Sequence, residues 1–215
     1  MYLLVTATEM EARPLRAILP ASPEYQIFVA GVGLSETAVN LTRFLATGNA
    51  EVERVIDFGV AGAYLAAGAK LLDLCLAGSE VIGDFGISFG SRLEPFASPL
   101  GPPPVFAMDP QLVAEAQQIL ARHGLSSLTG GFVTVNSVSG TAERGNLLRD
   151  RHQGLCENME GAAVARVCQE FSLPLLELRC VSNMVEDRNL AGWQLDRAVE
   201  LCAHAVSVLV NDASL

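Results

Sequence analysis

The sequence predicts one α/β domain in which helices cover both faces of a central, mostly parallel twisted sheet, a three-layer αβα arrangement. Short apolar runs alternate with longer amphipathic stretches, and this alternation is typical of parallel sheets covered by helices. The 215 residues suffice for a sizeable core, because 50% of them are hydrophobic and only 18% are charged. The sequence shows no internal repeat, charge run or linker, so we expect residues 1–215 to form a single domain.

Each strand is predicted from a short apolar run, and each helix from a longer stretch whose apolar residues recur every three or four positions. The strands are expected at residues 3–7, 26–30, 54–58, 74–82, 132–138 and 175–181. The helices are expected at residues 10–18, 35–46, 110–122, 159–171 and 190–210. In this order most strands are followed by a helix, as the crossover connections of a parallel sheet require.

Several boundaries carry start or stop signals. Asp109 before Pro110 is a helix cap followed by a proline that suits the first turn, and His123 before Gly124 marks a helix end. Gly31-Val32-Gly33 separates the second strand from the second helix and predicts a tight turn.

Residues 87–107 contain many glycines and prolines and are expected to form no regular element. A loop of this length inside a compact domain is usually a lid, a binding loop or a partner contact. Because the loop is also apolar, we expect the protein to bury it in a homodimer or a higher homo-oligomer.

The composition excludes several classes of partner. A formal net charge of −10 opposes binding to nucleic acid or to an anionic membrane, which leaves a small molecule as the expected partner. The first residues lack a basic region and a cleavage site, and no run reaches transmembrane length, so we expect a cytoplasmic protein. The five cysteines form no C-x-x-C pair and the three histidines lack metal-ligand spacing. We therefore expect reduced core cysteines, no metal and no cofactor.

Two motifs in the second half of the chain carry the most chemistry. Glu160 stands at the start of a helix of small residues, where a carboxylate is either a helix cap or a ligand hook. Ser182 and Asn183 end the following apolar strand, at the edge of the sheet where open α/β folds bind ligands. Glycine-marked turns precede both motifs.

In their order and spacing these motifs resemble the nucleoside phosphorylase and nucleosidase superfamily and, within it, the futalosine hydrolase family. The resemblance covers nearly the whole chain and rests on Thr6-Ala7-Thr8-Glu9-Met10-Glu11, Gly31-Val32-Gly33, Asp57-Phe58-Gly59-Val60-Ala61-Gly62, Ser139-Gly140-Thr141, Asn158-Met159-Glu160-Gly161 and Ser182-Asn183. It implies hydrolysis of the N-ribosidic bond of futalosine to hypoxanthine and dehypoxanthine futalosine, a step of an alternative menaquinone route in bacteria. The alternatives are a nucleosidase for 5′-methylthioadenosine or S-adenosylhomocysteine, a purine nucleoside phosphorylase, and a non-catalytic nucleoside-binding relative.

The resemblance gives roles to two glutamates. Glu160 would bind the ribose 2′,3′-diol, because one carboxylate accepts hydrogen bonds from two vicinal hydroxyls. Met159 would pack against the sugar, and Arg179 would be the charge partner of Glu160. Glu11 would activate the attacking water as a general base. The alternative for both glutamates is a first-turn residue that complements the helix dipole.

The turn after the third strand indicates which group attacks the sugar. Ala61 and Gly62 are candidate substrate contacts, because small residues let backbone groups approach a ligand closely. Phosphorylases of the superfamily usually place an arginine just before this turn to hold phosphate, whereas this sequence has Asp57. A carboxylate near that place favours water over phosphate as the attacking group. A dinucleotide site at the Gly31-Val32-Gly33 turn is disfavoured, because Glu36 replaces the third glycine of that fingerprint.

Asn183 indicates which purine base the site would bind. Adenosine-type nucleosidases carry an aspartate here to protonate N7 of adenine, and an amide cannot deliver a proton. Asn183 can donate to N7 and pair with a 6-oxo group, which suits hypoxanthine. A simple turn role for Asn183 is the alternative. Asp187 is a further candidate acid, and the base could stack on Phe85, Phe89 or Trp193.

Overall fold

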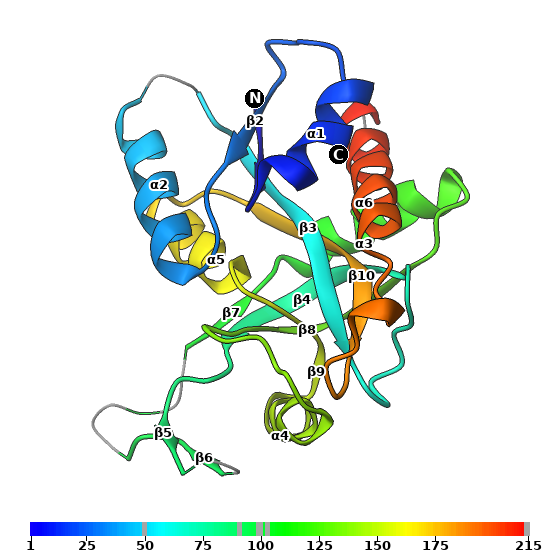
Figure 1. The fold of residues 1–215 in the computed structure, drawn as a ribbon. Helices are drawn as coiled ribbons and strands as arrows, with labels where there is room; N and C mark the ends of the chain where they lie inside the picture. Colours follow the sequence, from blue (N-terminus) through cyan, green and yellow to red (C-terminus); the bar gives the residue numbers. More distant parts are fainter. Residues whose placement is uncertain (49–50, 90–91, 98–100, 102–103, 213–215) are drawn as a thin grey trace.

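The computed structural model has the predicted α/β architecture (Figure 1). It describes residues 1–48, 51–89, 92–97, 101 and 104–212. Several glycines and prolines of the predicted 87–107 loop lie outside the described residues, namely Gly90, Pro99, Pro102 and Pro103.

All six predicted strands and all five predicted helices have counterparts in the structure. The described strands are β1 (Tyr2–Thr6), β2 (Tyr25–Val29), β3 (Arg54–Tyr64), β4 (Leu74–Ile82), β5 (Ile87–Ser88), β6 (Leu93–Glu94), β7 (Val105–Ala107), β8 (Ser127–Thr134), β9 (Gly154–Asn158) and β10 (Leu175–Val185). The described helices are α1 (Glu9–Ile18), α2 (Leu34–Ala46), α3 (Pro110–Arg122), α4 (Ala142–His152), α5 (Gly161–Glu170) and α6 (Leu195–Asn211), and a 3-10 turn at Leu190–Gly192 precedes α6.

The main sheet is mostly parallel, as predicted, but it also closes on itself. Its strand order is β10-β4-β8-β9-β3-β1-β2, with β7 paired to β4. Five of its described pairings are parallel and three are antiparallel. Because β10 pairs with β3 as well as with β4, the strands β3, β10, β4, β8 and β9 form a ring from which β1 and β2 extend.

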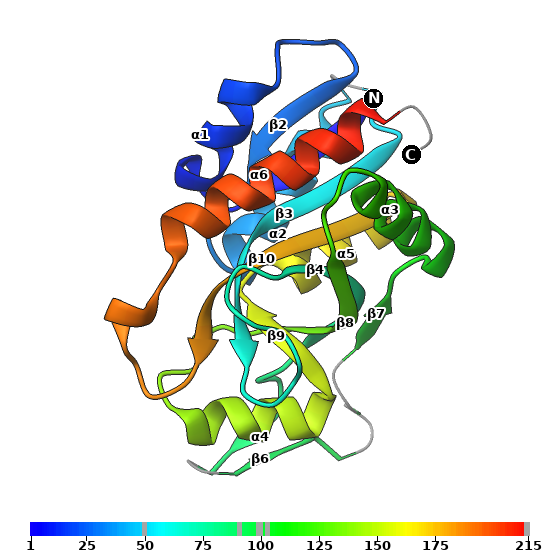
Figure 2. The ribbon, with the colours of Figure 1, turned by 90° about the vertical axis from the view of Figure 1, so that its right-hand side faces the viewer.

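Helices cover both sides of this sheet (Figures 1 and 2). Helices α1, α3 and α6 lie together on one side, and α2 and α5 lie together on the other. Helix α4 lies across one end, against β9 and near the β5–β6 hairpin. None of the helices in the described ranges has both the length and the apolar character needed to cross a bilayer.

Four regions differ from the prediction. The sequence does not predict α4, which is mostly polar, or β9, which pairs with β8 and β3. The 87–107 segment contains the β5–β6 hairpin and β7, whose pairing partner is the distant strand β4. Strands β3 and β10 each continue for 11 residues, past the small and polar residues that resemble strand ends. For the strands the missing information is a long-range pairing, which local periodicity does not encode.

Candidate active site

The residues singled out by sequence lie near the carboxyl end of β1 and along the second half of β3. Glu11 Oε1 accepts a hydrogen bond from the backbone N–H of Val60 at 3.2 Å. Asn183 on β10 lies beside Gly62 of β3 in the strand register. Glu160, at the start of α5, is close enough to Glu11 for its pKa to respond to the charge of that carboxylate. The structure therefore brings Glu11, Glu160 and Asn183 to one region, around residues 60–62.

Glu11 has both a local and a long-range role in the structure. It closes a capping box with Thr8, because its Oε2 accepts from the Thr8 backbone N–H at 3.1 Å and its own N–H donates to Thr8 Oγ1. Glu11 therefore also has the alternative role, in which it stabilises the first turn of α1. However, Glu11 Oε1 points away from this cap, and a Cβ at Gly59 would lie only 2.5 Å from it. The absence of a side chain at Gly59 leaves room for the carboxylate beside the β3 backbone.

Glu160 occupies the N-cap position of α5, but its side chain makes no capping hydrogen bond. Asn158 takes that role, since its Oδ1 accepts from the backbone N–H groups of Glu160 and Gly161 at 2.9 and 2.8 Å. Glu160 instead directs Oε1 to the Gly33 N–H, 2.9 Å away, in the turn before α2. Burial raises the pKa of Glu160, and the charge of Glu11 adds to this, whereas Arg179 and the Gly33 N–H oppose the shift. Because the Glu160 carboxylate accepts from a residue outside its own helix, it fits a ligand-binding role better than a helix-capping role.

Arg179 does not form an ion pair with Glu160, so the predicted pairing is wrong in its direct form. The Arg179 guanidinium is only 1% exposed, and its ion pairs go to Asp57 Oδ2 at 2.5 Å and to Glu177 Oε1 at 3.0 Å. Its Nη1 atom would lie 2.7 Å from a Cβ at Gly59. Arg179 therefore lies beneath Glu11 and acts on Glu160 through its charge alone.

Asp57 is also placed differently from the expectation. Its side chain is 1% exposed and pairs with Arg179 inside the sheet, so it does not face an incoming anion. Asp57 itself therefore does not disfavour phosphate, and Arg179 is the residue that bears on phosphate binding. The guanidinium nearest to Gly59 is already paired with the Asp57 carboxylate and hydrogen-bonded to Glu177, which leaves little attraction for a phosphate.

Two further buried carboxyl groups lie under the start of α5. A side chain at Gly161 would collide with Glu80 and Glu177, so both carboxyls lie against this glycine. Asn158 joins them, since its Nδ2 donates to Glu80 and, at 3.5 Å, to Glu177 Oε1. Burial raises the pKa of Glu80 to about 7, against hydrogen bonds from Asn158 and Thr134, and it raises the pKa of Glu177 well above its ordinary value. Glu177 Oε2 has no partner, which fits a proton held between the two groups.

The Ser182-Asn183 pair lies within β10, where the register shifts by one residue between Val181 and Asn183. Ser182 Oγ donates to Asn183 Oδ1 at 2.9 Å, and Asn183 Nδ2 donates to the Met184 carbonyl at 3.2 Å. Met159 is partly buried beside Glu160. Asn183 is half-buried, so its amide is accessible at the edge of the sheet.

Asp187 is an exposed residue whose Oδ1 accepts from the Ala142 N–H at the start of α4. This contact gives Asp187 a structural role. Among the three aromatic candidates, Trp193 is the one whose segment is tied to the site, because the next residue, Gln194, donates its N–H to the Ser182 carbonyl at 2.8 Å.

The Ser139 turn is held by Glu157, a residue to which the sequence assigned no role. Glu157 Oε1 accepts from the Ser139 N–H and Oε2 accepts from Ser139 Oγ, each at 2.7 Å. Glu157 also lies opposite Gly62 in the β3–β9 register. The turn expected to frame the base is therefore fixed directly to the strand beside Gly62.

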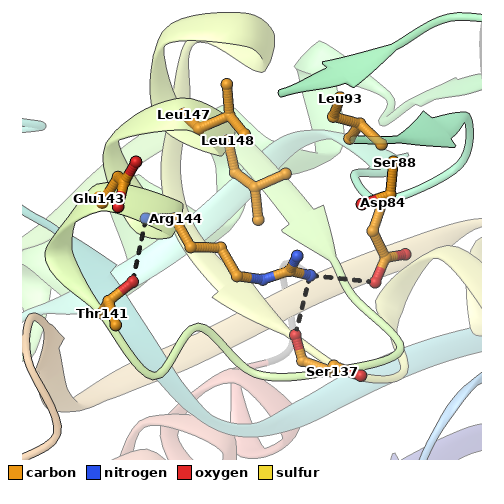
Figure 3. A pocket seen from close by; sticks show the side chains of 9 residues that line it. All are labelled: Asp84, Ser88, Leu93, Ser137, Thr141, Glu143, Arg144, Leu147 and Leu148. Carbon is orange, nitrogen blue, oxygen red and sulfur yellow. Dashed lines mark hydrogen bonds and ion pairs between the residues drawn. The ribbon is translucent and has the colours of Figure 1, made fainter. Parts of the chain in front are cut away.

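A cavity of about 370 Å³ lies on the other side of this turn, between α4 and the β5–β6 hairpin (Figure 3). Arg144 crosses it, and its Nη2 reaches Asp84 Oδ2 at 3.3 Å and the Ser137 carbonyl at 3.2 Å. None of Glu11, Glu160 and Asn183 lines this cavity. It is thus separate from the place where the three residues meet. Across the described ranges, no three histidine, cysteine, aspartate or glutamate side chains are arranged to hold a metal ion.

Sequence reasoning missed four polar residues that the structure places in or under the site, namely Glu80, Glu157, Asn158 and Glu177. Glu177 carries a signal, because an acidic residue stands in an otherwise apolar strand and two positions before Arg179. Glu80 carries the same kind of signal, because it is an acidic residue within β4. Glu157 and Asn158 lie on β9, which the sequence does not predict, and their neighbours are set by strand register.

Comparisons with known proteins find relatives that cover most of the chain. The family model of the phosphorylase superfamily matches residues 21–211. A futalosine hydrolase of Thermus thermophilus is 32% identical over 99% of this chain and 96% of the relative. A 5′-methylthioadenosine/S-adenosylhomocysteine nucleosidase of Staphylococcus epidermidis is 24% identical over 85% of this chain and 79% of the relative. Among solved structures, a futalosine hydrolase mutant of Helicobacter pylori has the same fold, with a TM-score of 0.83, 22% identity and 98% of each chain covered.

Proposed function

The chain belongs to the phosphorylase superfamily, and we propose that its particular substrate is futalosine, cleaved to hypoxanthine and dehypoxanthine futalosine in menaquinone biosynthesis. The relatives named above are nucleosidases, and the protein is accordingly an N-glycosyl hydrolase that acts on a nucleoside. In the reaction the bond between the anomeric carbon and N9 breaks, its electron pair goes to the purine, and a water oxygen bonds to the sugar. The transition state has oxocarbenium character, as in other glycoside hydrolyses.

In this proposal the two glutamates act on the sugar. Glu160 binds the ribose 2′,3′-diol through the carboxylate oxygen that the Gly33 N–H does not occupy, with Met159 beside the sugar. Glu11 takes a proton from the attacking water, which its Oε1 can reach above Gly59. Both carboxylates also stabilise positive charge at the anomeric carbon. The supporting observation is that two buried glutamates from distant parts of the sequence come together, because Glu11 accepts from the Val60 N–H and its charge acts on Glu160.

Water, and not phosphate, is the nucleophile in this proposal. Arg179 is paired with Asp57 and Glu177, and Glu11 lies directly above it. A phosphate anion would meet the charge of Glu11 and find the nearby guanidinium already neutralised. Arg179 then contributes by holding the carboxylates in place and by favouring their ionised forms.

Asn183 stabilises the leaving base by hydrogen bonding. Its amide donates to N7 as electron density moves into the purine, and it suits a 6-oxo group better than a 6-amino group. A proton from solvent then neutralises the departing hypoxanthine. The nucleosidase for adenine nucleosides is the second candidate, and it is favoured by the similarity to 5′-methylthioadenosine/S-adenosylhomocysteine nucleosidases, at 24% and 28% identity.

We further propose a cytoplasmic homodimer. The five cysteines, all buried and free, fit a reducing compartment. Several large apolar side chains of the β5–β6 region are exposed, including Phe85, Ile87 and Phe89, and burial against a second copy would remove them from water. Gel filtration with light scattering tests the dimer, and a monomeric mass at working concentration contradicts it.

The function is tested by a base-release assay with futalosine, inosine and 5′-methylthioadenosine, each with and without phosphate. We expect hypoxanthine release from futalosine at the same rate in both conditions. Release only from methylthioadenosine would favour the adenine nucleosidase. Dependence on phosphate would show that water is not the nucleophile.

A further inference from the structure

Two carboxyl groups lie side by side beneath the start of α5. Glu80 on β4 and Glu177 on β10 are both 0% exposed. A Cβ at Gly161 would lie 2.5 and 2.7 Å from the two oxygens of Glu177 and closer still to Glu80 Oε1. The absence of a side chain at Gly161 therefore leaves room for both carboxyls against the first turn of the helix, directly after Glu160.

Glu80 is the acceptor on which the start of α5 depends. Its Oε1 accepts from Asn158 Nδ2, and its Oε2 accepts from Thr134 Oγ1 at 2.8 Å. Asn158 Oδ1 in turn accepts from the N–H groups of Glu160 and of the next residue. Thr134 Oγ1 accepts from the Ala162 N–H at 2.8 Å. These three consecutive N–H groups are therefore held by two side chains that both donate to Glu80.

The hydrogen bonds of the two carboxyls indicate which of them carries the proton. A carboxylate offers about four lone-pair directions. Glu80 fills three of them, because its Oε2 also accepts from the Val81 N–H at 3.1 Å, and the fourth, on Oε1, remains for Glu177. Glu177 Oε1 accepts from Arg179 Nε at 3.0 Å and from Asn158 Nδ2 at 3.5 Å, whereas Glu177 Oε2 is buried without a partner. A proton on Oε2 turns this unpaired acceptor into a donor toward Glu80.

The groups around the two carboxyls also favour one proton. Arg179 is the positive group that acts on both, and it is already paired with Asp57 at 2.5 Å. Ionisation of both carboxyls would therefore bury two adjacent negative charges beside a cation that is already paired. Cys156 and Tyr64 are close enough to respond to these charges, but burial raises the pKa of both groups, so they remain neutral. A hydrogen bond between the two carboxyls is among the causes that raise the pKa of Glu177.

We propose that Glu177 is a positioning residue, a neutral acid whose Oε2 hydroxyl donates to Glu80 and thereby holds the start of α5, with Glu160, in place for the sugar diol. This inference rests on the proposed function, because it takes Glu160 as the residue that binds the diol. The backbone N–H of Glu160 is held by Asn158, while its side chain reaches the Gly33 N–H at 2.9 Å. A shift of the first turn of α5 would move the Glu160 carboxylate away from Gly33 and from the sugar.

Infrared spectroscopy tests the position of the proton without a substrate. In a difference spectrum between wild type and Glu177→Gln at neutral pH, we expect the C=O absorption of a protonated carboxyl group to be lost in the variant and to shift in D2O. Glu170→Gln is the matched control, because Glu170 is an exposed partner of Arg166 and its loss should remove only the bands of an ionised carboxylate. Carboxylate bands in the difference spectrum of Glu177→Gln would overturn the inference.

Steady-state kinetics of two matched variants tests the positioning role. In Glu177→Gln the amide oxygen keeps the acceptor for Arg179, and the NH2 group replaces the donating hydroxyl. Glu80→Gln instead replaces an acceptor oxygen by a donor, so one of the side chains that hold α5 loses its partner. We expect KM to be about tenfold or more higher in Glu80→Gln than in Glu177→Gln, the range for a hydrogen bond to a charged group, with a smaller difference in kcat.

The remaining outcomes separate this inference from the proposed function. KM is measured with whichever of futalosine and 5′-methylthioadenosine the wild-type protein cleaves. If only methylthioadenosine is cleaved and shows the expected difference in KM, the inference stands and the proposed nucleoside is wrong. If futalosine is cleaved and the two variants have equal KM values, or Glu177→Gln has the higher one, the function stands and the inference is wrong. Should Glu80→Gln fail to fold, Thr134→Val removes one of the two links between Glu80 and α5 and should raise KM in the same way.

Discussion

The carboxylate of Glu160 accepts a hydrogen bond from the backbone N–H of Gly33, 2.9 Å away, although 127 positions separate the two residues in the sequence. Gly33 adopts a φ of +87° at the start of α2, a conformation that favours glycine. Nothing lies within 4 Å of the place where its Cβ would be. The contact therefore depends on the backbone conformation of the turn and not on a shortage of space.

Gly33→Ala should weaken substrate binding several-fold. Either alanine keeps the φ of Gly33 at a cost of about 1–2 kcal/mol, or the turn relaxes and directs its N–H away from Glu160. Gly124→Ala is the matched control, because Gly124 follows α3 with a φ of +77° and equally open space. We expect similar losses of melting temperature in both variants and a raised KM only in Gly33→Ala. An unchanged KM in Gly33→Ala would show that the contact does not position Glu160.

Glu11→Gln should lower kcat about a hundredfold or more, the contribution typical of a general base. One of the backbone N–H groups of Thr8 and Val60 loses its acceptor, so stability should also fall by about 1 kcal/mol. Single-turnover base release with saturating substrate measures the chemical step without the binding step.

Two variants of the same helix control for the other roles of Glu11. Thr8→Ala removes the cap and should cost a similar free energy of unfolding, about 1 kcal/mol, with a much smaller effect on kcat. Glu9→Gln removes an exposed first-turn charge and should leave kcat unchanged. If Glu11→Gln retains the wild-type kcat, Glu11 is only a capping residue.

The Glu80–Glu177 pair should make the protein less stable as the pH rises. Burial raises the pKa of Glu80 from 4.5 to about 7 and that of Glu177 still further from its ordinary value. Between pH 4.5 and 7 the unfolded chain releases these protons while the folded protein keeps them, so the folded state binds more protons and stability falls with pH. The pKa of Glu177 is raised in the same direction, so Glu177 adds to this decline.

Glu177→Gln should flatten this decline, because its amide keeps the acceptor for Arg179 Nε and donates permanently toward Glu80. Urea unfolding between pH 5 and 9 measures the difference from wild type, which should favour the variant increasingly above pH 7. Glu170→Gln, an exposed partner of Arg166, is the control and should run parallel to wild type. Parallel curves for Glu177→Gln would mean that the pair holds no proton.

The sequence predicts the elements whose signals are local. The Asp109 cap and the glycine after His123 define α3, and its predicted bounds agree with the structure. Helix α4 lacks a clear apolar stripe. Its buried Leu148 packs in a cluster with distant residues such as Val185 of β10, and this packing is not visible in the local sequence. Closure of the sheet likewise depends on β10 pairing with both β3 and β4.

The candidate site also contains residues with local sequence signals and residues whose roles depend on long-range contacts. Glu11, Glu160 and Asn183 are recognisable because each stands at an element boundary beside small residues. Their partners are not, because the Gly33 N–H, the Asp57 carboxylate and the Glu157 side chain reach the site through tertiary contacts. The direct pairing of Arg179 with Glu160 is wrong for this reason, since strand pairing, which the sequence does not show, places Asp57 beside the guanidinium.

Asn183→Asp should shift the preferred base from hypoxanthine toward adenine. A protonated aspartate at this position can deliver a proton to N7, which the amide cannot, whereas the ionised aspartate repels N7 and O6 of a 6-oxopurine. Glu157 lies over the same glycine, and its charge favours the protonated form of the new carboxyl. We expect base release from adenine nucleosides to rise about tenfold or more and release from 6-oxopurine nucleosides to fall.

Asn189→Asp is the matched control for Asn183→Asp, because Asn189 is exposed and an aspartate can still accept from the Ala191 N–H. It adds the same charge outside the pocket and should change neither activity. If Asn183→Asp gains no activity on adenine nucleosides while its melting temperature stays near that of wild type, Asn183 does not choose the base.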